Sequence, residues 1–186
     1  YEISTRDWSS DVCSSDLLAV LHSISLPPGL YGGDAIERLF TNRLDWDAHP
    51  YFQAIRGLQV SSHFLIRRDG QCLQFVSVDE RAWHAGASSW RGRGNCNDWS
   101  VGIELEGLEG ESFEPAQYEA LRAVLRALSA RYPVTDIVGH EHVAPGRKAD
   151  PGAGFDWLAL QAGLPAHGPQ VAGEVLAAAR PPSSLA

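Results

Sequence analysis

Apolar and polar positions along the chain predict short strands interleaved with helices. Residues 17–24, "LLAVLHSI", are apolar on both sides and short, which favours a strand inside a sheet. Residues 101–107, "VGIELEG", and 136–140, "DIVGH", predict two further strands. Between them, the apolar spacing in "EPAQYEALRAVLRALSARY" predicts the clearest helix, with Pro115 in the first turn, where proline is tolerated.

Shorter patterns complete the expected fold. Residues 34–40 predict a short helix with Asp34 as its N-cap, and residues 51–55 a turn of helix. Residues 60–78 predict a hairpin around an Asp-Gly turn, and residues 80–100 a long loop. Together these elements predict an α/β fold, a single domain with a mixed central β-sheet flanked by helices.

The two ends of the chain differ from its middle. Residues 1–17 lack apolar periodicity, and "DWSSDVCSSD" within them resembles the translation of a common sequencing-library adapter. We therefore expect an adapter-derived, non-native segment in place of the original start; the alternative is a genuine polar arm. Residues 18–162 are expected to form the domain. Residues 163–186, where Ala, Gly and Pro dominate, are expected to be a flexible C-terminal tail.

Composition narrows the classes of partner. The net charge of −8 argues against a nucleic-acid or anionic-membrane surface, since both require clustered Lys and Arg. No apolar run approaches the roughly 20 residues of a membrane helix. Three cysteines, Cys13, Cys72 and Cys96, form a sparse, odd set that fits free thiols in a reducing compartment.

Two histidines and a carboxylate suggest a metal site. His22 and His140 end predicted strands, and Asp150 follows in a loop. Zinc hydrolases commonly use three protein ligands of this type and leave one position open for water. A single histidine at a strand end is more often structural, however. His142 would face the same way as His140 if the strand continued, so spacing cannot choose between them.

Two glutamates and a lysine could supply the remaining chemistry. Glu104 and Glu106 share one face of a predicted strand. One of them could act as a general base, or both could lie on the wet face of an edge strand. Lys148 could stabilise an oxyanion, or it could be a solvated loop lysine.

Seven motifs follow one another between about Leu18 and Leu160: "LHSISLPPG", "HFLIRRDG", "RAWHAG", "CNDWSVGIELEG", "QYEAL", "GHEHVAPGRKADPG" and "FDW". Together they resemble the AmpD-type N-acetylmuramyl-L-alanine amidases of the wider amidase_2 and peptidoglycan-recognition fold. The resemblance implies a Zn²⁺ ion held by His22, His140 and Asp150. It implies Glu104 as the general base and Lys148 as the oxyanion-stabilising cation. It also implies that Trp83 and His84 line the substrate cleft, with Arg147 near a substrate carboxylate. His63, His49 and Glu106 are expected to be structural.

The implied reaction is hydrolysis of the amide between N-acetylmuramic acid, in its 1,6-anhydro form, and L-alanine of muropeptides. The implied setting is cell-wall recycling by a monomer in the bacterial cytoplasm, provided that no native signal peptide has been lost. A non-catalytic peptidoglycan-binding module and an amidase acting on intact peptidoglycan remain alternatives. Ser23, Gln59 and Asn95 depart from the family pattern and put individual substrate contacts in doubt.

Overall fold

Two short apolar segments that are far apart in the sequence pair at the centre of a β-sheet. The computed structural model describes residues 16–180, and in that range β1 (Leu17–Ile24) runs parallel to β6 (Ser100–Glu106). All of β6 and most of β1 are buried, as expected for strands that are covered on both faces. The prediction of two buried strands is therefore confirmed.

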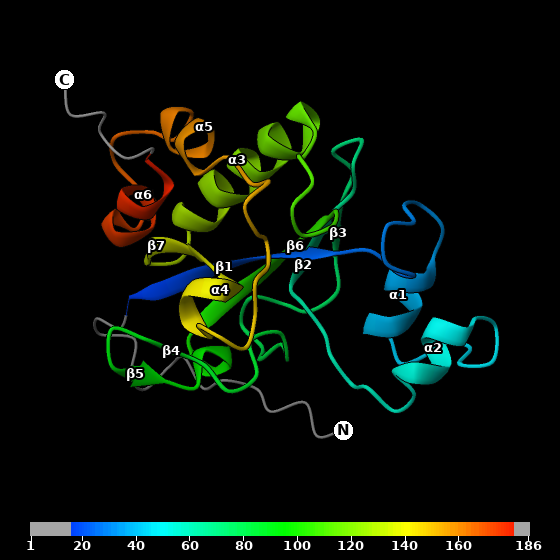
Figure 1. The fold of residues 1–186 in the computed structure, drawn as a ribbon. Coiled ribbons are helices and arrows are strands. Elements are labelled where there is room, and N and C mark those ends of the chain that lie inside the picture. Colours follow the sequence, from blue (N-terminus) through cyan, green and yellow to red (C-terminus); the bar gives the residue numbers. More distant parts are fainter. Residues whose placement is uncertain (1–15, 181–186) are drawn as a thin grey trace.

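Further strands extend this centre on both sides (Figure 1). Across the described residues the order is β3-β2-β6-β1-β7-β8. The added strands are β2 (Phe64–Ile66), β3 (Cys72–Gln74), β7 (Val134–Gly139) and β8 (Gln170–Val171). Neighbouring strands are parallel except β2 and β3, which form the predicted hairpin. The sheet is mixed, and the predicted fold class is confirmed.

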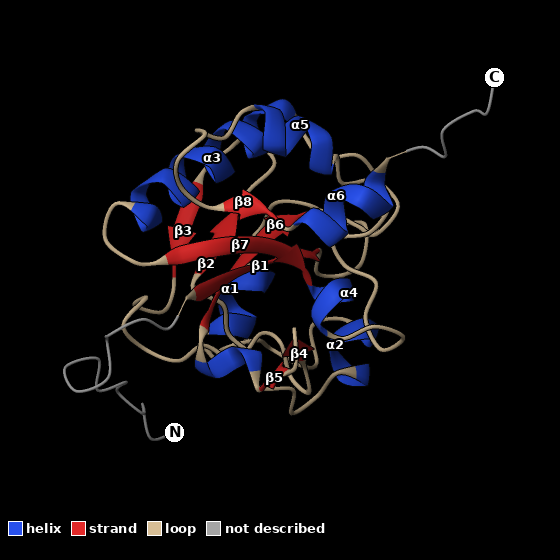
Figure 2. Ribbon diagram, turned by 90° about the vertical axis from the view of Figure 1, so that its left-hand side faces the viewer, coloured by secondary structure: helices blue, strands red, loops and turns tan. Residues whose placement is uncertain are grey.

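Helices cover both faces of this sheet (Figure 2). Their bounds are α1 (Ala35–Phe40), α2 (Pro50–Ala54), α3 (Pro115–Ser129), α4 (His140–Val143), α5 (Trp157–Ala162) and α6 (Gly173–Ala179). α3 and α5 lie on one side of the sheet, whereas α1, α2 and α4 lie on the other. No helix in the described part of the chain combines the length and the apolar character needed to cross a bilayer.

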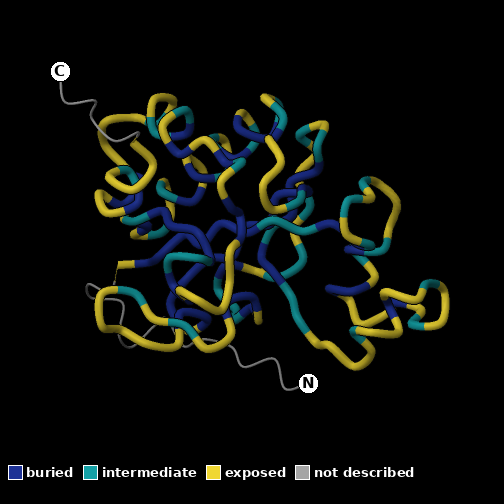
Figure 3. Tube along the Cα trace, in the orientation of Figure 1, coloured by how far each residue is buried: buried dark blue, intermediate teal, exposed yellow. Residues whose placement is uncertain are grey.

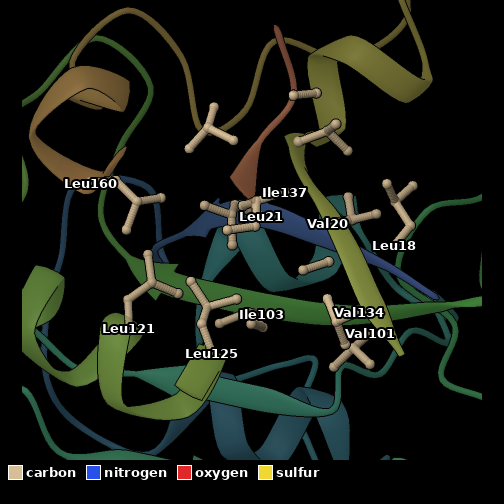
Figure 4. Close-up of a cluster of buried hydrophobic side chains, with 14 of the residues drawn as sticks. Leu18, Val20, Leu21, Val101, Ile103, Leu121, Leu125, Val134, Ile137 and Leu160 are labelled. Atoms are coloured by element: carbon tan, nitrogen blue, oxygen red, sulfur yellow. The ribbon is translucent and has the colours of Figure 1, made fainter. Parts of the chain in front are cut away.

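The main core lies between the sheet and α3. Leu121 and Leu125 of α3 are fully buried beside Ile103 of β6 (Figure 4). A second cluster of buried side chains packs α1 and α2 against the sheet around Leu65. Figure 3 shows the buried strands at the centre and the exposed loops around α1 and α2. The domain therefore has a buried central sheet whose strand ends can hold a site.

Two local predictions need correction. The expected loop over residues 80–100 contains a small hairpin, β4 (Ser89–Trp90) with β5 (Arg93–Gly94), followed by a 3₁₀ turn at Cys96–Asp98. Asp34 precedes α1 as predicted, but its side chain makes no capping hydrogen bond. It accepts a hydrogen bond from Arg38 instead, at 2.7 Å.

The expected flexible tail is wrong for residues 163–180. β8 pairs in parallel with β7 and completes the sheet, and α6 follows it. Val171 and Val175 are buried in the main core. The sequence did not predict this segment, because a two-residue strand is too short to show periodicity and forms only through tertiary contacts. Residues 181–186 of the predicted tail, and residues 1–15 of the predicted adapter segment, lie outside the described residues.

Deleting residues 164–186 is expected to lower the free energy of unfolding by at least about 3 kcal/mol, because two buried valines are lost. Urea denaturation of the shortened and complete chains measures this difference. Removing residues 181–186 alone is the control and should leave the midpoint unchanged. Equal midpoints for the complete chain and the longer deletion would show that β8 and α6 add nothing to the core.

Candidate active site

Three parallel strands bring the predicted site residues together at the carboxyl ends of the strands. β1, β6 and β7 are neighbours and run the same way, so their carboxyl ends meet, where α/β proteins commonly bind ligands. His22 lies near the end of β1, directly opposite Glu104 of β6 in the register. His140 is the first residue after β7, and Asp150 follows α4.

His22, His140 and Asp150 form a buried cluster of metal-ligand atoms. The Nδ1 atoms of the two histidines lie 3.0 Å apart, and each lies 3.0–3.1 Å from Oδ2 of Asp150. Tetrahedral ligands at about 2.0–2.1 Å from a zinc ion lie about 3.3 Å from one another. Three lone-pair atoms in so small a triangle need a positive charge among them. The donor set therefore fits a zinc ion.

His142, the alternative that spacing left open, does not join this cluster. The strand ends at Gly139 and α4 begins at His140, so the chain turns between the two histidines. Nδ1 of His142 accepts a hydrogen bond from the backbone N–H of Gly139, and its ring packs against Trp157. His142 therefore serves the start of α4.

Burial sets the protonation states of the cluster. It lowers the pKa of His22 to about 4, against the opposing effect of the adjacent Asp150 carboxylate. Burial alone would raise the pKa of Asp150, but the adjacent imidazoles of His140 and His22 outweigh it and hold this pKa below its ordinary value. At neutral pH His22 is therefore neutral and Asp150 is ionised, and these are the forms that bind a metal.

Glu104 and Glu106, two positions apart on one strand, have different surroundings. The alternative of a wet edge strand is wrong, because β6 lies between β1 and β2. Glu106 accepts a hydrogen bond from the guanidinium of Arg67 at 2.8 Å and another from the backbone of Gly32 at 2.7 Å. The carboxylate of Glu104, by contrast, has no hydrogen-bonding partner among the described residues. Burial raises the pKa of Glu104 well above its usual range, and the charge of Asp150 adds to this shift.

The cluster opens into a cleft of about 420 Å³. Glu104 and Lys148 both line it beside the three cluster residues. Lys148 is exposed, and it is the only lysine in the sequence. Across the cleft the wall is apolar and comes from α1, α2 and their flanking loops: Leu26, Leu39, Phe40, Ile55, Leu58 and Val60. The cleft therefore combines a polar, reactive end with an apolar end.

Trp83, the predicted cleft residue, lies on another side of the opening. It lines the cleft and is 46% exposed. The guanidinium of Arg81 stacks on its ring, 3.7 Å from the ring centre, and Arg81 is held in turn by Asp98 at 2.6 Å. This stack fixes a flat aromatic surface at the cleft.

Arg147 and His84 are positioned differently from a simple cleft wall. Arg147 does not line the cleft; its guanidinium donates to the backbone carbonyls of Ala85 and Ala87, at 2.6 and 2.8 Å. His84 borders the cleft but is buried, with its ring nitrogens near His22 and Ser100. Ala85 and Ser100 lie within the motifs "RAWHAG" and "CNDWSVGIELEG", but neither residue type by itself predicts a role at the site.

The residues that depart from the family pattern also differ in position. Ser23 lines the cleft, so it can affect substrate contacts. Gln59 and Asn95 do not line it. Asn95 has a left-handed backbone conformation (φ 54°) before the 3₁₀ turn, which asparagine tolerates better than arginine. His63, expected to be structural, is buried and accepts a hydrogen bond from the backbone of Gly102.

This combination is typical of mononuclear metal hydrolases: three ligand atoms in a buried triangle, an isolated carboxylate and a cation at one end of a cleft. The sequence profile of the N-acetylmuramoyl-L-alanine amidase family matches residues 18–153. The chain belongs to this family, as the motifs predicted.

Known relatives agree with the assignment. The chain is 54% identical over 147 residues to the 1,6-anhydro-N-acetylmuramyl-L-alanine amidase AmpD of Citrobacter freundii, covering 78% of this chain and 79% of the relative. A crystal structure of AmpD superposes with a TM-score of 0.78 at 51% identity, covering 82% of this chain and 86% of that one. AmiD from E. coli, solved with the substrate anhydro-N-acetylmuramic acid-L-Ala-D-gamma-Glu-L-Lys, superposes with a TM-score of 0.60 at 31% identity. The match covers 89% of this chain and 64% of AmiD.

Proposed function

We propose that this protein is a zinc-dependent amidase that cuts the bond between 1,6-anhydro-N-acetylmuramic acid and the L-alanine of muropeptides. The observation that carries the proposal is the buried triangle of His22, His140 and Asp150 beside Glu104 in one cleft. The similarity to AmpD supports the anhydro sugar as the preferred substrate.

The chain's own residues divide the chemistry among them. His22, His140 and Asp150 would hold the zinc ion, which acts as a Lewis acid and makes water a stronger nucleophile when it is bound. Glu104, with its raised pKa, is suited to take a proton from the attacking water and to pass it to the leaving amine of L-alanine. Lys148 lies at the same end of the cleft, where its ammonium group would stabilise the oxyanion of the tetrahedral intermediate.

The remaining cleft residues would bind the substrate. Trp83 offers a flat surface on which a sugar ring or an apolar part of the stem peptide can pack. The hydrogen bonds of Arg147 to Ala85 and Ala87 favour a role in holding the loop over direct contact with a substrate carboxylate.

A non-catalytic binding module is the main rival. A module of that kind needs neither a general base nor a complete ligand set. An unpaired carboxylate such as Glu104 is costly to bury, so its retention beside a complete ligand set favours catalysis.

Lys148→Met is expected to lower kcat by about 100- to 1,000-fold, the usual effect of removing one oxyanion-stabilising group. The zinc content should remain that of the wild-type protein, because Lys148 is not in the ligand cluster. Steady-state kinetics and metal analysis of the purified variant measure both quantities.

Two variants control this experiment. Lys148→Arg keeps the cation and should retain more activity than Lys148→Met. Arg131→Met removes an exposed cation that does not line the cleft, and it should leave kcat unchanged. Full activity in Lys148→Met would contradict the oxyanion role.

The substrate preference is tested by competition among three substrates: an anhydromuropeptide, the matching muropeptide with an intact reducing-end sugar, and polymeric peptidoglycan. We expect the anhydromuropeptide to have the highest kcat/KM. That result would also support a place in the cytoplasm, where the free thiols of Cys72 and Cys96 are stable. A preference for polymeric peptidoglycan would instead identify a wall-lytic amidase.

A further inference from the structure

Both histidines of the cluster have a partner on the ring nitrogen that faces away from it. Nε2 of His22 lies 3.0 Å from Nδ1 of His84. Nε2 of His140 lies 3.1 Å from the carbonyl oxygen of Ala85. Two consecutive residues thus contact the two histidines: His84 contacts His22, and Ala85 contacts His140. His84 and His22 are 62 positions apart in the sequence.

The position of His84 is fixed from several sides. Its backbone N–H and that of Ala85 both donate to Oδ1 of Asn97, at 3.1 and 2.8 Å. Its ring fills the space over Gly102 of β6, where an added Cβ would lie 2.5 Å from Cγ of His84. The ring cannot turn or shift easily, because a backbone strand lies directly beneath it.

The hydrogen bonds around His84 have one consistent direction. The hydroxyl of Ser100 lies 2.5 Å from the carbonyl oxygen of Cys96, which can only accept, so the hydroxyl donates there. The Ser100 oxygen can then only accept from Nε2 of His84, 3.3 Å away. In a neutral imidazole this leaves Nδ1 of His84 as an acceptor, and Nε2 of His22 must be the donor.

We propose that His84 is a positioning residue that keeps the proton of His22 on Nε2, so that Nδ1 of His22 points unprotonated into the metal cluster. Ser100 and the Cys96 carbonyl fix the direction of this chain. The inference rests on the proposed function, since it takes His22 to be a zinc ligand. It gives His84 a role distinct from the cleft lining predicted for it.

The test measures zinc affinity by competition with a chromogenic chelator. His84→Leu leaves the N–H of His22 without an acceptor and is expected to weaken zinc binding by about 10- to 100-fold, as is usual for a lost partner of a metal-bound histidine. His84→Gln offers a side-chain oxygen in place of Nδ1 and should restore much of the affinity. Ser100→Ala should weaken binding less than His84→Leu.

Three comparisons keep the outcome unambiguous. His49→Leu is the matched control, because His49 caps α2 and does not line the cleft, and it should leave zinc affinity unchanged. The melting temperature of each metal-free variant shows whether the fold is kept. The absorption of Co²⁺ in place of zinc reports the ligand geometry and should change in His84→Leu.

The possible results separate the two proposals. If the wild-type protein binds no zinc, the proposed function fails. If the wild type binds zinc and His84→Leu binds it equally well, the positioning role of His84 is overturned while the proposed function stands. If His84→Leu raised KM and left zinc affinity unchanged, His84 would be a substrate-binding residue of the cleft and not a positioning residue. Equal losses in His84→Gln and His84→Leu would overturn the hydrogen-bond explanation.

Discussion

Glu104→Gln should abolish most of the amidase activity and at the same time make the metal-free protein more stable. The activity loss is expected to be about 100- to 10,000-fold, the range for a lost general acid or base. The stability gain follows from burial, because Glu104 is 7% exposed and its carboxylate has no hydrogen-bonding partner among the described residues. Rates of peptide release and thermal melts of the same preparation test both parts.

The stability gain should depend on pH in a defined direction. Because burial raises the pKa of Glu104 in the folded protein, the folded state holds this proton after the unfolded chain has lost it. The stability of the wild-type protein therefore falls as pH rises from the ordinary pKa of a glutamate to the raised pKa of Glu104. The stability of Glu104→Gln should not fall over this interval, because glutamine does not ionise. The two proteins should melt alike below the ordinary pKa of a glutamate, and the variant should melt higher at about pH 8.

Glu106→Gln is the matched control on the same face of β6. Glu106 is buried and paired with Arg67, so the change weakens a charged hydrogen bond and should cost about 2 kcal/mol of stability. The protein that remains folded should retain its catalytic rate. If Glu104→Gln lowered stability as Glu106→Gln does and kept activity, the general-base role of Glu104 would be refuted.

Asp150→Asn should remove both the activity and the stabilisation of the fold by zinc. A ligand that binds only the folded state adds about 4 kcal/mol when it is present at about 1,000 times its Kd. The wild-type melting temperature should therefore rise with added zinc. The variant should show little or no rise, because one ligand of the His22, His140 and Asp150 triangle has lost its charge.

The metal-free variant should also lose a pH-dependent contribution to stability. The pKa of Asp150 lies below its ordinary value in the folded protein, so its ionised form stabilises the fold at neutral pH. This contribution disappears as pH falls through the depressed pKa. Asp156→Asn is the control: it keeps an N-cap side chain on α5 and should leave the zinc response intact. An equal response to zinc in Asp150→Asn and the wild type would exclude Asp150 as a ligand.

The sequence predicted the elements whose own pattern is strong. β1 and β6 are short, buried strands and α3 has one apolar face, and each begins and ends within a few residues of its predicted bounds. β8 escaped prediction because its two residues gain stability only by pairing with β7. The spacing of apolar residues therefore predicts the central strands and α3 better than it predicts the outermost strand of the sheet.

The site residues were predicted from the family motifs. The spacing of residues alone could not choose between neighbouring candidates of the same type. His140 and His142 look equivalent in the sequence, and they separate only because α4 begins at the first of them. Glu104 and Glu106 also look equivalent, but Arg67, which directly follows the neighbouring strand β2, pairs only with Glu106. Contacts between distant segments decide which of two similar residues does the chemistry.

The most direct test of the proposed activity is mass spectrometry of an anhydromuropeptide after incubation with the purified protein. The reaction is run as prepared, with a zinc chelator, and with the chelator followed by excess zinc. We predict that free peptide and anhydro-N-acetylmuramic acid appear, disappear with chelator and return with zinc. An intact substrate in all three reactions, from a folded and zinc-loaded protein, would contradict the assignment as an anhydromuropeptide amidase.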